Sequence, residues 1–383
     1  MTEKIRCVLL SEMLQPYRIP VFNWIARDER IELEVLLLSV REANRQWEIE
    51  MERCEFKHCT VPSKDFYVRS LDWGLHFNWG VKSALEDLRP DVVAGTGYVS
   101  PAYLTGQKWA KRNEAGYVLW SGSTAATSRI GKGPLKWMKK RFVRNCDAYL
   151  SYGTDATKQL VALGADPERV VTGCNTVDIE EFGRMAEEAR SRPEFGEWRE
   201  RYPKHLILFI GQMIERKGVR DLLRAFRSIK NRDMGLVLIG EGPEMERYRQ
   251  EFEGVEGLYW EGYKQTRDLG PFLASADVLV MPSRLEIWGL VVNEAMAAGL
   301  PVIATTCSGS TTDLVEDGVT GYSFEAGDEM ALSTLLKSVA DHPERWAEIG
   351  RTARERIQKH HPREYARCFV ESVILARQNT IKG

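Results

Sequence analysis

The sequence predicts an α/β protein built from two doubly wound, Rossmann-like domains. Short aliphatic runs alternate with helical patterns along the whole chain, which is typical of parallel βαβ units. The chain has 383 residues and so exceeds the roughly 250–300 residues at which a single core stops growing. Ligands of such domains bind at the carboxyl ends of the strands, so we expect the two domains to face each other across a cleft.

In the first half, strands are expected at the runs RCVLLS, LEVLLLS, DVVAG, GYVLW and DAYLSY. Helical patterns follow some of these runs, for example at residues 102–112 and 155–163. We therefore expect a first domain over residues 1–180. The highly charged stretch 181–203 predicts a linker helix.

A second series of strands is expected at HLILFIG, GLVLIG, GLYW, ADVLVMPS and PVIATT. Helices are expected near residues 219–229, 243–252 and 290–298. This series predicts a second domain over residues 204–361. An amphipathic pattern over residues 362–383 predicts a last helix.

Composition argues against several classes of function. The net charge of −2 and the pI of about 6.4 give no overall attraction to nucleic acid. The seven cysteines include no close CxxC pair, so neither a zinc site nor a disulfide framework is expected, and a reducing cytoplasm is favoured. No signal peptide is expected, and no segment approaches the roughly 18 apolar residues of a membrane-spanning helix.

The run RLEIWGLVVNEAMAAGLPVIAT (284–305) places two acidic residues, Glu286 and Glu294, around a predicted helix start at Gly289. A helix that begins after a parallel strand offers free backbone N–H groups to an anion. A carboxylate beside it can accept hydrogen bonds from the neighbouring hydroxyls of a sugar. Glutamates on a partly exposed helix are also often simply solvated, and their spacing alone does not decide between the two interpretations.

The surrounding sequence resembles the signature of the retaining glycosyltransferases of family four, which have the two-domain GT-B fold. Besides residues 282–305, similar runs are FIGQMIERKGVRDLLRAF (209–226), LIGEGPE (238–244) and EDGVTGYSF (316–324). The resemblance is specific from about Gly153 onward. It implies a nucleotide-sugar site in the second domain and a C-terminal helix that crosses back to the first.

In that family the first glutamate holds the donor sugar and the second holds the nucleotide ribose, which implies these roles for Glu286 and Glu294. The resemblance implies a catalytic role for Glu286 together with Lys217. It implies that donor-binding groups, some of them backbone amides, come from Gly211, Gln212, Arg216, Gly240, Tyr263, Lys264, Trp288, Gly289 and Leu290. No metal or other cofactor is expected.

Two positions depart from the family pattern. Gln212 stands where the family has an arginine that faces the diphosphate, and Arg216 is a possible replacement. Many members also carry a histidine after a strand of the first domain, whereas the matching run here is VLWSGST (118–124). Retention needs no such base in this family, because the departing phosphate oxygen can take the acceptor proton. Catalysis would then rest on positioning and electrostatics.

The acceptor is expected to bind the first domain. The loop after the first strand lacks the GxGxxG of a dinucleotide site, which argues against a nicotinamide enzyme. Weak acceptor-side candidates are Gln15, Tyr17, Arg18, Trp120 and Ser121, and for the loop residues ordinary helix packing is the alternative.

The segment KGPLKWMKKRFVRN (132–145) is basic and interleaved with apolar and aromatic residues. Such a helix suits shallow binding to an anionic membrane, although a helix with its apolar stripe in the domain core is the alternative. In the membrane interpretation, the protein works at the inner face of the cell membrane on a lipid-linked acceptor or a growing cell-surface glycan.

The resemblance thus implies a retaining glycosyltransferase that moves a hexose-type sugar from a nucleoside diphosphate sugar to a hydroxyl acceptor, as in polysaccharide biosynthesis, and we expect it in the cytoplasm. Two alternatives stay open. One is a catalytically silent sugar-nucleotide-binding protein, suggested by Gln212. The other is a GT-B sugar-nucleotide epimerase.

Overall fold

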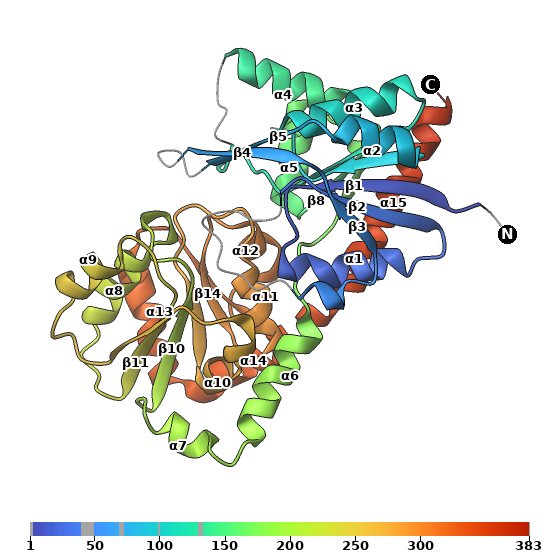
Figure 1. Cartoon of the computed structure of the whole chain (residues 1–383). Coiled ribbons are helices and arrows are strands. Elements are labelled where there is room, and N and C mark those ends of the chain that lie inside the picture. The colour runs from blue at the N-terminus through green and yellow to red at the C-terminus, as the bar shows by residue number, and fades with distance from the viewer. Residues whose placement is uncertain (1–2, 40–49, 69–72, 99, 129–132, 383) are drawn as a thin grey trace. The chain divides into compact units, whose positions relative to one another are not determined.

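The structure is a computed structural model that describes residues 3–39, 50–68, 73–98, 100–128 and 133–382 (Figure 1). The chain forms two compact units. Unit 1 comprises Met1–Cys174 together with Pro362–Gly383, and unit 2 comprises Asn175–His361. Each unit is built on a parallel sheet with helices on its faces, which confirms the predicted α/β fold class.

Unit 1 contains a seven-stranded parallel sheet in the order β3-β2-β1-β6-β7-β8-β9. Its strands are β1 (Ile5–Ser11), β2 (Ile31–Leu37), β3 (Lys57–Thr60), β6 (Val92–Gly95), β7 (Gly116–Ser121), β8 (Ala148–Ser151) and β9 (Val170–Thr172). A separate antiparallel pair joins β4 (Ser63–Val68) and β5 (Trp73–Asn78). The helices are α1 (Ile19–Ala26), α2 (Val81–Leu88), α3 (Pro101–Arg112), α4 (Pro134–Arg144), α5 (Thr154–Leu163) and α15 (Pro362–Lys382).

The alternation of side chains along the strands gives the sheet of unit 1 two buried faces. In β1, Leu9 points into the cluster that includes α1 and α15, whereas Leu10 points into the cluster that includes α2, α3, α4 and α5. Parallel sheets covered on both faces have nearly continuous aliphatic strands. The strands of this kind are those that the sequence predicted, whereas the largely exposed β3 and the short β9 were not predicted.

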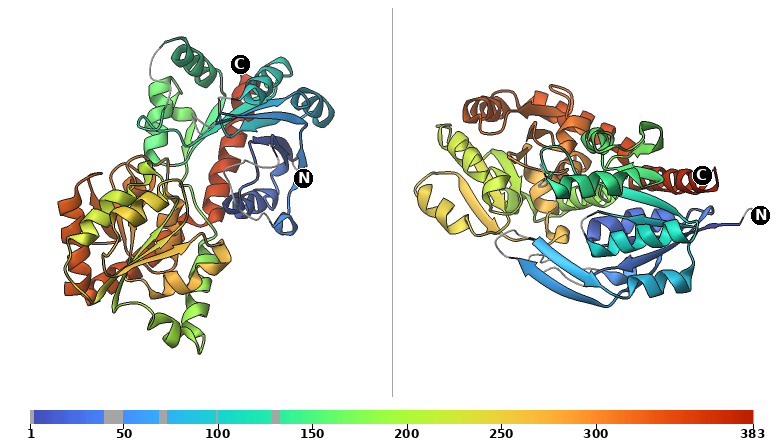
Figure 2. Two further views of the ribbon diagram at one scale, coloured as in Figure 1. Left: turned by 60° about the vertical axis from the view of Figure 1, so that its left-hand side comes forward. Right: turned by 90° about the horizontal axis from the view of Figure 1, so that it is seen from above.

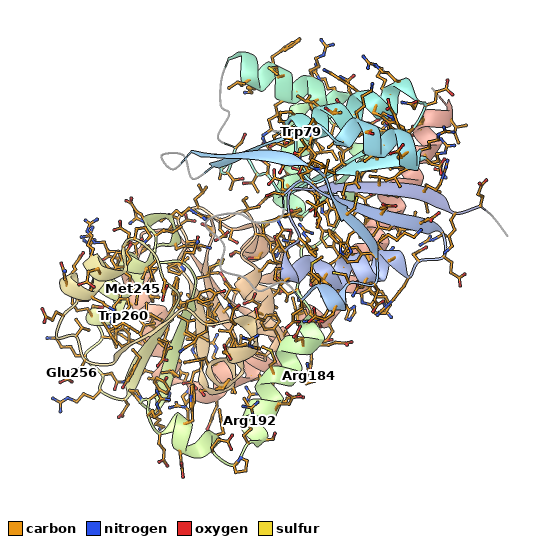
Figure 3. The ribbon with its side chains drawn as sticks, viewed as in Figure 1. Trp79, Arg184, Arg192, Met245, Glu256 and Trp260 are labelled. Carbon is orange, nitrogen blue, oxygen red and sulfur yellow. The ribbon has the colours of Figure 1, made fainter. Side chains whose placement is uncertain are left out.

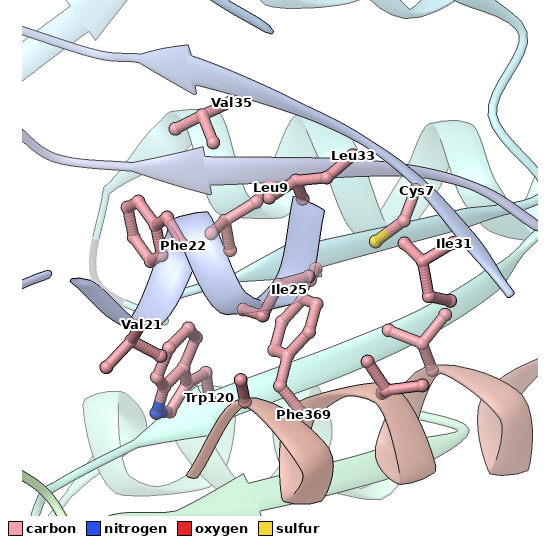
Figure 4. Close-up of a cluster of buried hydrophobic side chains, with 14 of the residues drawn as sticks. Cys7, Leu9, Val21, Phe22, Ile25, Ile31, Leu33, Val35, Trp120 and Phe369 are labelled. Atoms are coloured by element: carbon pink, nitrogen blue, oxygen red, sulfur yellow. The ribbon is translucent and has the colours of Figure 1, made fainter. Parts of the chain in front are cut away.

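The last helix completes the core of unit 1. α15 packs beside α1 and against β7, β8 and β9 (Figure 2). Figure 4 shows Phe369 of α15 in the cluster with Phe22 and Ile25 of α1 and Trp120 of β7. Phe369 has no exposed surface, so a segment from the end of the chain supplies core that unit 1 cannot obtain from its own first part.

Unit 2 contains a six-stranded parallel sheet in the order β12-β11-β10-β13-β14-β15. Its strands are β10 (His205–Ile210), β11 (Met234–Ile239), β12 (Leu258–Gly262), β13 (Val278–Met281), β14 (Val302–Thr305) and β15 (Gly321–Phe324). Its helices are α6 (Ile179–Ser191), α7 (Phe195–Arg199), α8 (Val219–Arg227), α9 (Met245–Glu251), α10 (Gly270–Ser275), α11 (Leu290–Ala297), α12 (Gly309–Leu314), α13 (Glu329–Asp341) and α14 (Pro343–Ile357). Each predicted strand and helix of this half is present within a few residues.

The stretch 181–203, which we expected to be a linker, is part of unit 2. One face of α6 is apolar or small and buried against α10 and α11, with Phe182 and Ala186 at helical spacing. The charges that suggested a linker lie on the other face, where the exposed Arg184 (Figure 3) pairs with Glu188 at 2.9 Å. The units therefore meet in sequence at Cys174 and Asn175, and not at residue 180.

Within the described ranges, none of the helices combines the length and the apolarity needed to cross a bilayer. The same residues contain no group of three or more His, Cys, Asp or Glu side chains that could hold a metal ion. Of the basic segment 132–145, residue Lys132 lies outside the described residues, and nearly all of the rest forms α4.

Candidate functional site

The site lies at the point in the sheet of unit 2 where the strand order reverses. From β10 the chain runs outward through β11 to β12, and then returns to β13 on the other side of β10. In open parallel sheets, ligands bind outside the carboxyl ends of the two strands at such a point. The residues there are Gly211 and Gln212 after β10, and Pro282 and the loop that contains Glu286 after β13.

The two loops at this point are joined by backbone contacts. Residues Glu215–Lys217 form a short 3-10 helix, and the carbonyl of Arg216 accepts a hydrogen bond of 2.8 Å from the amide of Arg284. Gly218 follows with φ of +66°, and a Cβ there would lie 1.9 Å from the carbonyl oxygen of Pro282. Only glycine allows both this conformation and this approach. The loop after β10 is thereby fixed against the loop after β13.

This arrangement brings the two predicted catalytic residues together. The ammonium group of Lys217 forms an ion pair with the carboxylate of Glu286, and both side chains are largely buried. Ser283 donates a longer hydrogen bond of 3.5 Å to the same carboxylate oxygen. A partly buried charge pair with a defined geometry can present a carboxylate to a sugar and a cation to a phosphate at one place.

The second glutamate lies on α11 and is only partly exposed. Burial raises the pKa of Glu294 to about 7, and the positive charge of Lys217 opposes this rise. Among the described residues its carboxylate has no hydrogen-bonding or ion-pairing partner. Its oxygens are therefore able to accept hydrogen bonds from a ligand.

α11 begins beside these carboxylates. Its N-cap is Gly289 at φ +87°, where a Cβ would lie 2.5 Å from the sulfur of Met281. In the described part of the chain, the amides of Leu290 and Val291 have no acceptor, as is usual in the first turn of a helix. Such amides and the helix dipole together can attract an anion.

Trp288 precedes α11 and is held by several internal hydrogen bonds. Its ring is buried, and its indole N–H donates to the side chain of Asn293 at 2.9 Å. Asn293 in turn donates to the carbonyl of Asn175 at 3.1 Å. The carbonyl of Trp288 accepts hydrogen bonds from Ser308 and from the amide of Ser310. These bonds fix the chain where it enters α11.

The loop after β11 lies against the loop after β10 because both its glycines lack a side chain. A Cβ on Gly240, at φ +130°, would be 1.9 Å from the carbonyl oxygen of Gly211. A Cβ on Gly242 would be 2.4 Å from that of Met213. The predicted positions Gly211 and Gly240 are thus in direct backbone proximity at the carboxyl edge of the sheet.

The remaining predicted donor residues are less closely connected. The side chains of Gln212 and Arg216 have no hydrogen-bonding or ion-pairing partner among the described residues. Tyr263 and Lys264 follow β12, two strands away from β10. Lys264 pairs with Glu261 at 3.4 Å.

An ion pair that the sequence analysis did not identify supports the site. Arg284 donates two hydrogen bonds, of 2.8 and 2.7 Å, to the carboxylate of Asp221 in the first turn of α8. Asp221 is almost fully buried. The pair fixes the loop two residues before Glu286. The sequence does contain a signal for this pair, namely an aspartate within the apolar stripe of a helix. A buried carboxylate there needs a polar partner.

The acceptor-side expectations differ from the structure. Trp120 has no exposed surface and donates its indole N–H to the hydroxyl of Tyr365 at 2.6 Å. Arg18 is 2% exposed, with its guanidinium 4.5 Å from the Trp120 ring centroid and hydrogen-bonded to Tyr152. Both side chains are interior because the aromatic residues of α15 pack on this edge of the sheet. They are therefore not placed to contact an acceptor.

The other acceptor-side candidates occupy the carboxyl edge of the sheet in unit 1. Gln15 and Tyr17 follow β1 and are partly exposed. Ser121 ends β7 and is buried, and its hydroxyl accepts a hydrogen bond of 3.3 Å from the amide of Ser123. Gln15 and Tyr17 remain candidates for acceptor contact, whereas Ser121 has a local structural role.

Sequence comparison identifies the family of the second unit. Residues 204–342 match the family described as glycosyl transferases group 1. Unit 2 contains a glycosyl transferases group 1 domain. The loops after β10 and β13, the Lys217–Glu286 pair and Glu294 all lie inside this domain.

Relatives of the group 1 domain carry related names. The chain is 33% identical over 232 residues to the sulfoquinovosyl transferase SQD2 of Arabidopsis thaliana, covering 58% of this chain and 44% of that protein. It is 30% identical over 239 residues to a D-inositol 3-phosphate glycosyltransferase of Corynebacterium kroppenstedtii, covering 58% of this chain and 51% of that protein. The chain thus spans about half the length of these relatives.

Solved glycosyltransferase structures confirm the GT-B fold around the group 1 domain. HepE of Anabaena, solved in complex with UDP and glucose, aligns with a TM-score of 0.75 at 14% identity over 97% of this chain and 99% of that one. A sucrose-phosphate synthase of Thermosynechococcus elongatus aligns with a TM-score of 0.74 at 16% identity over 99% of this chain and 100% of that one. At such low identity the likeness concerns the fold.

Proposed function

We propose that the protein is a retaining glycosyltransferase that moves a hexose-type sugar from a nucleoside diphosphate sugar to a hydroxyl acceptor. One observation carries this proposal. In the group 1 domain, Lys217, Glu286, Glu294 and the start of α11 lie near the point where the strand order of the sheet reverses. The positive groups suit a diphosphate and the two carboxylates suit sugar hydroxyls.

Each group has a distinct role in this proposal. The amides of Leu290 and Val291, with the ammonium of Lys217, hold the diphosphate. Glu294 accepts hydrogen bonds from the ribose diol, since its carboxylate has no partner within the described chain. Glu286, positioned by Lys217, accepts hydrogen bonds from the transferred sugar.

In the proposed reaction, the acceptor oxygen forms a bond to the anomeric carbon while the bond from that carbon to the diphosphate oxygen breaks. The departing phosphate oxygen takes the proton of the acceptor hydroxyl on the same face, so the configuration is retained. Negative charge grows on the diphosphate, and the helix start and Lys217 stabilise it without reorganisation. We propose that no metal is needed for this step.

For the acceptor, we propose a hydroxyl of a cell-surface glycan, a polysaccharide or a lipid-linked sugar, used on the cytoplasmic side of the cell membrane. The names of the relatives, which include a D-inositol 3-phosphate glycosyltransferase and a phosphatidyl-myo-inositol mannosyltransferase of Mycobacterium leprae, support this class. UDP is the first donor nucleotide to test, because HepE was solved with UDP and with UDP-glucose.

The decisive experiment titrates UDP, GDP and ADP into the 383-residue protein by calorimetry and then measures nucleotide release from the matching nucleotide sugars. We expect one nucleotide to bind and its sugar to be consumed when a hydroxyl acceptor is present. NMR of the product would show the retained anomeric configuration. Failure of every nucleoside diphosphate to bind would overturn the proposal.

A catalytically silent sugar-nucleotide-binding protein is the second candidate, and Gln212 favours it. A neutral amide there cannot balance charge that develops on the leaving diphosphate, and loss of one such donor typically costs about 100–1,000-fold in rate. A silent protein would bind the nucleotide without releasing it from its sugar. An epimerase, the third possibility, would convert the donor without any acceptor.

A further inference from the structure

Helix α4 extends an apolar surface beyond the core of unit 1. Its C-terminal half is anchored by Phe142 and Val143, which are buried in the cluster shared with α2, α3 and α5. In its N-terminal half Leu135, Trp137 and Met138 are 59%, 60% and 50% exposed. Three adjacent large apolar side chains on one helix form a patch of the kind that marks an interaction site.

The arrangement of α4 is fixed by the domain. Lys139 is buried, donates to the hydroxyl of Ser128 at 3.0 Å and lies 4.4 Å from the ring centroid of Tyr98. Together with Phe142, these contacts hold the side of the helix that faces the core. The exposure of Leu135 and Trp137 therefore belongs to the packed position of α4 and is not the result of a loosely attached helix.

The charged residues of α4 itself are all cations. Lys136 and Arg141 are exposed and Lys140 is partly exposed, and none of them has a carboxylate partner among the residues described. No aspartate or glutamate occurs in the sequence between Glu114 and Asp147. The whole chain has a net charge of −2, so this positive surface is local.

We propose that α4 docks on the surface of an anionic phospholipid bilayer. Trp137 and its neighbours enter the boundary between headgroups and acyl chains, while the cations lie at the level of the lipid phosphates. Charge complementarity selects this occupant. Packing of α4 against α4 of a second copy would bring like charges together, because the helix has no acidic residue to pair them. A nucleic acid offers no apolar surface to Leu135 and Met138.

The positive charge supplies the selectivity for anionic lipid. Each lysine or arginine near an anionic leaflet contributes roughly a fivefold gain in binding, and the effect falls with salt. Burial of the apolar side chains adds a contribution to the binding free energy that salt does not screen. Binding is therefore expected to need anionic lipid, to weaken at high salt, and to depend on both kinds of side chain.

The test is co-sedimentation of the 383-residue protein with vesicles of phosphatidylcholine, alone or mixed with phosphatidylglycerol. We expect binding to the anionic vesicles only. The variant K136Q/K140Q/R141Q should bind them roughly a hundredfold more weakly. The variant L135S/W137S/M138S should also lose binding, and neither change should alter the affinity for UDP.

A matched control removes three exposed cations elsewhere, in the variant K57Q/K158Q/R232Q, and gives the same net charge. It should bind as the unaltered protein does. Equal binding to both vesicle types, or equal losses in the two charge variants, would overturn the proposal. So would a protein that binds no vesicle, or one that dimerises through α4 and becomes monomeric in L135S/W137S/M138S. UDP binding tests the donor site separately, so the two proposals can fail independently.

Discussion

At the scale of single residues, the site depends on a carboxylate whose environment opposes its charge. Burial raises the pKa of Glu294 to about 7, from an ordinary value of 4.5. The folded protein therefore binds this proton more tightly than the unfolded chain does. The stability that this group contributes is fully present below pH 4.5, and it is lost as the pH rises from there to about 7. We infer that a ligand hydroxyl, and not the free protein, satisfies this carboxylate.

Replacing Glu294 by Gln should accordingly stabilise the free protein at pH 8 and leave its stability nearly unchanged at pH 4. The gain has an upper bound of about 3 kcal/mol, from the pKa difference. The same change should weaken UDP binding by about 10–100-fold, because a charged acceptor is lost. Urea unfolding at the two pH values and calorimetry would measure these effects.

The matched control for Glu294 is Glu316→Gln, an exposed glutamate paired with Arg356. It should change the unfolding free energy little, and UDP affinity not at all. If Glu294→Gln and this control behave alike in both measurements, Glu294 is a solvated surface residue and its proposed contact with ribose is wrong.

Lys217 serves two partners in the proposal, Glu286 and the diphosphate. Lys217→Ala should weaken UDP binding by about 10–100-fold, since it removes a charge-assisted contact from a partly buried site. Lys158→Ala, which breaks an exposed pair with Asp155 on α5, is the comparison, and its effect on UDP affinity should be smaller. Equal losses in the two variants would show that general positive charge, and not the position of Lys217, holds the nucleotide.

At the scale of elements, the site depends on how closely the loops after β10 and β13 approach. Gly218 sets this distance, because a Cβ would meet the carbonyl oxygen of Pro282 at 1.9 Å. The loop before α11 is fixed a second time by the pair of Arg284 and Asp221. Lys217 and Glu286 therefore meet as a consequence of loop packing, before any ligand is bound.

Gly218→Ala should destabilise the protein and displace Lys217. Gly327→Ala is a close control, because Gly327 also has positive φ, at +87°, but has nothing within 4 Å of the added Cβ. The control should cost about 1 kcal/mol from backbone strain alone, and Gly218→Ala distinctly more. UDP affinity should fall only in Gly218→Ala. Equal costs in the two variants would contradict close docking of the loops.

The sequence allowed the elements that carry the site to be predicted. The buried strands β10, β11 and β13 are continuous aliphatic runs, and the Glu286–Glu294 motif follows directly after β13. Contacts between segments distant in the sequence were not predictable. Trp120 was placed near an acceptor because it ends a strand, whereas its hydrogen-bond partner Tyr365 lies at the other end of the chain. Pairings of this kind depend on tertiary packing, which local patterns do not contain.

At the scale of the whole molecule, unit 1 is built from two separate segments of the sequence and unit 2 from one. Unit 2 is one continuous segment, Asn175–His361, and it contains the entire proposed donor site. Unit 1 needs α15, whose residues Tyr365 and Phe369 pack around Trp120. Loss of the packing of α15 should therefore destabilise unit 1 first. It should affect the donor site in unit 2 only because the two units belong to one chain.

Phe369→Ala tests this division. Phe369 has no exposed surface, so the truncation should cost about 3–5 kcal/mol through lost burial and the cavity left behind. Because the cost falls on unit 1, calorimetric melting should show one transition moving to lower temperature while a second stays in place. UDP should still bind, and it should raise only the second transition. Met330→Ala, on an exposed side chain of α13, is the control and should leave both transitions unchanged. A single transition that shifts as a whole, with loss of UDP binding, would show that the two units unfold together and that the donor site depends on the core of unit 1.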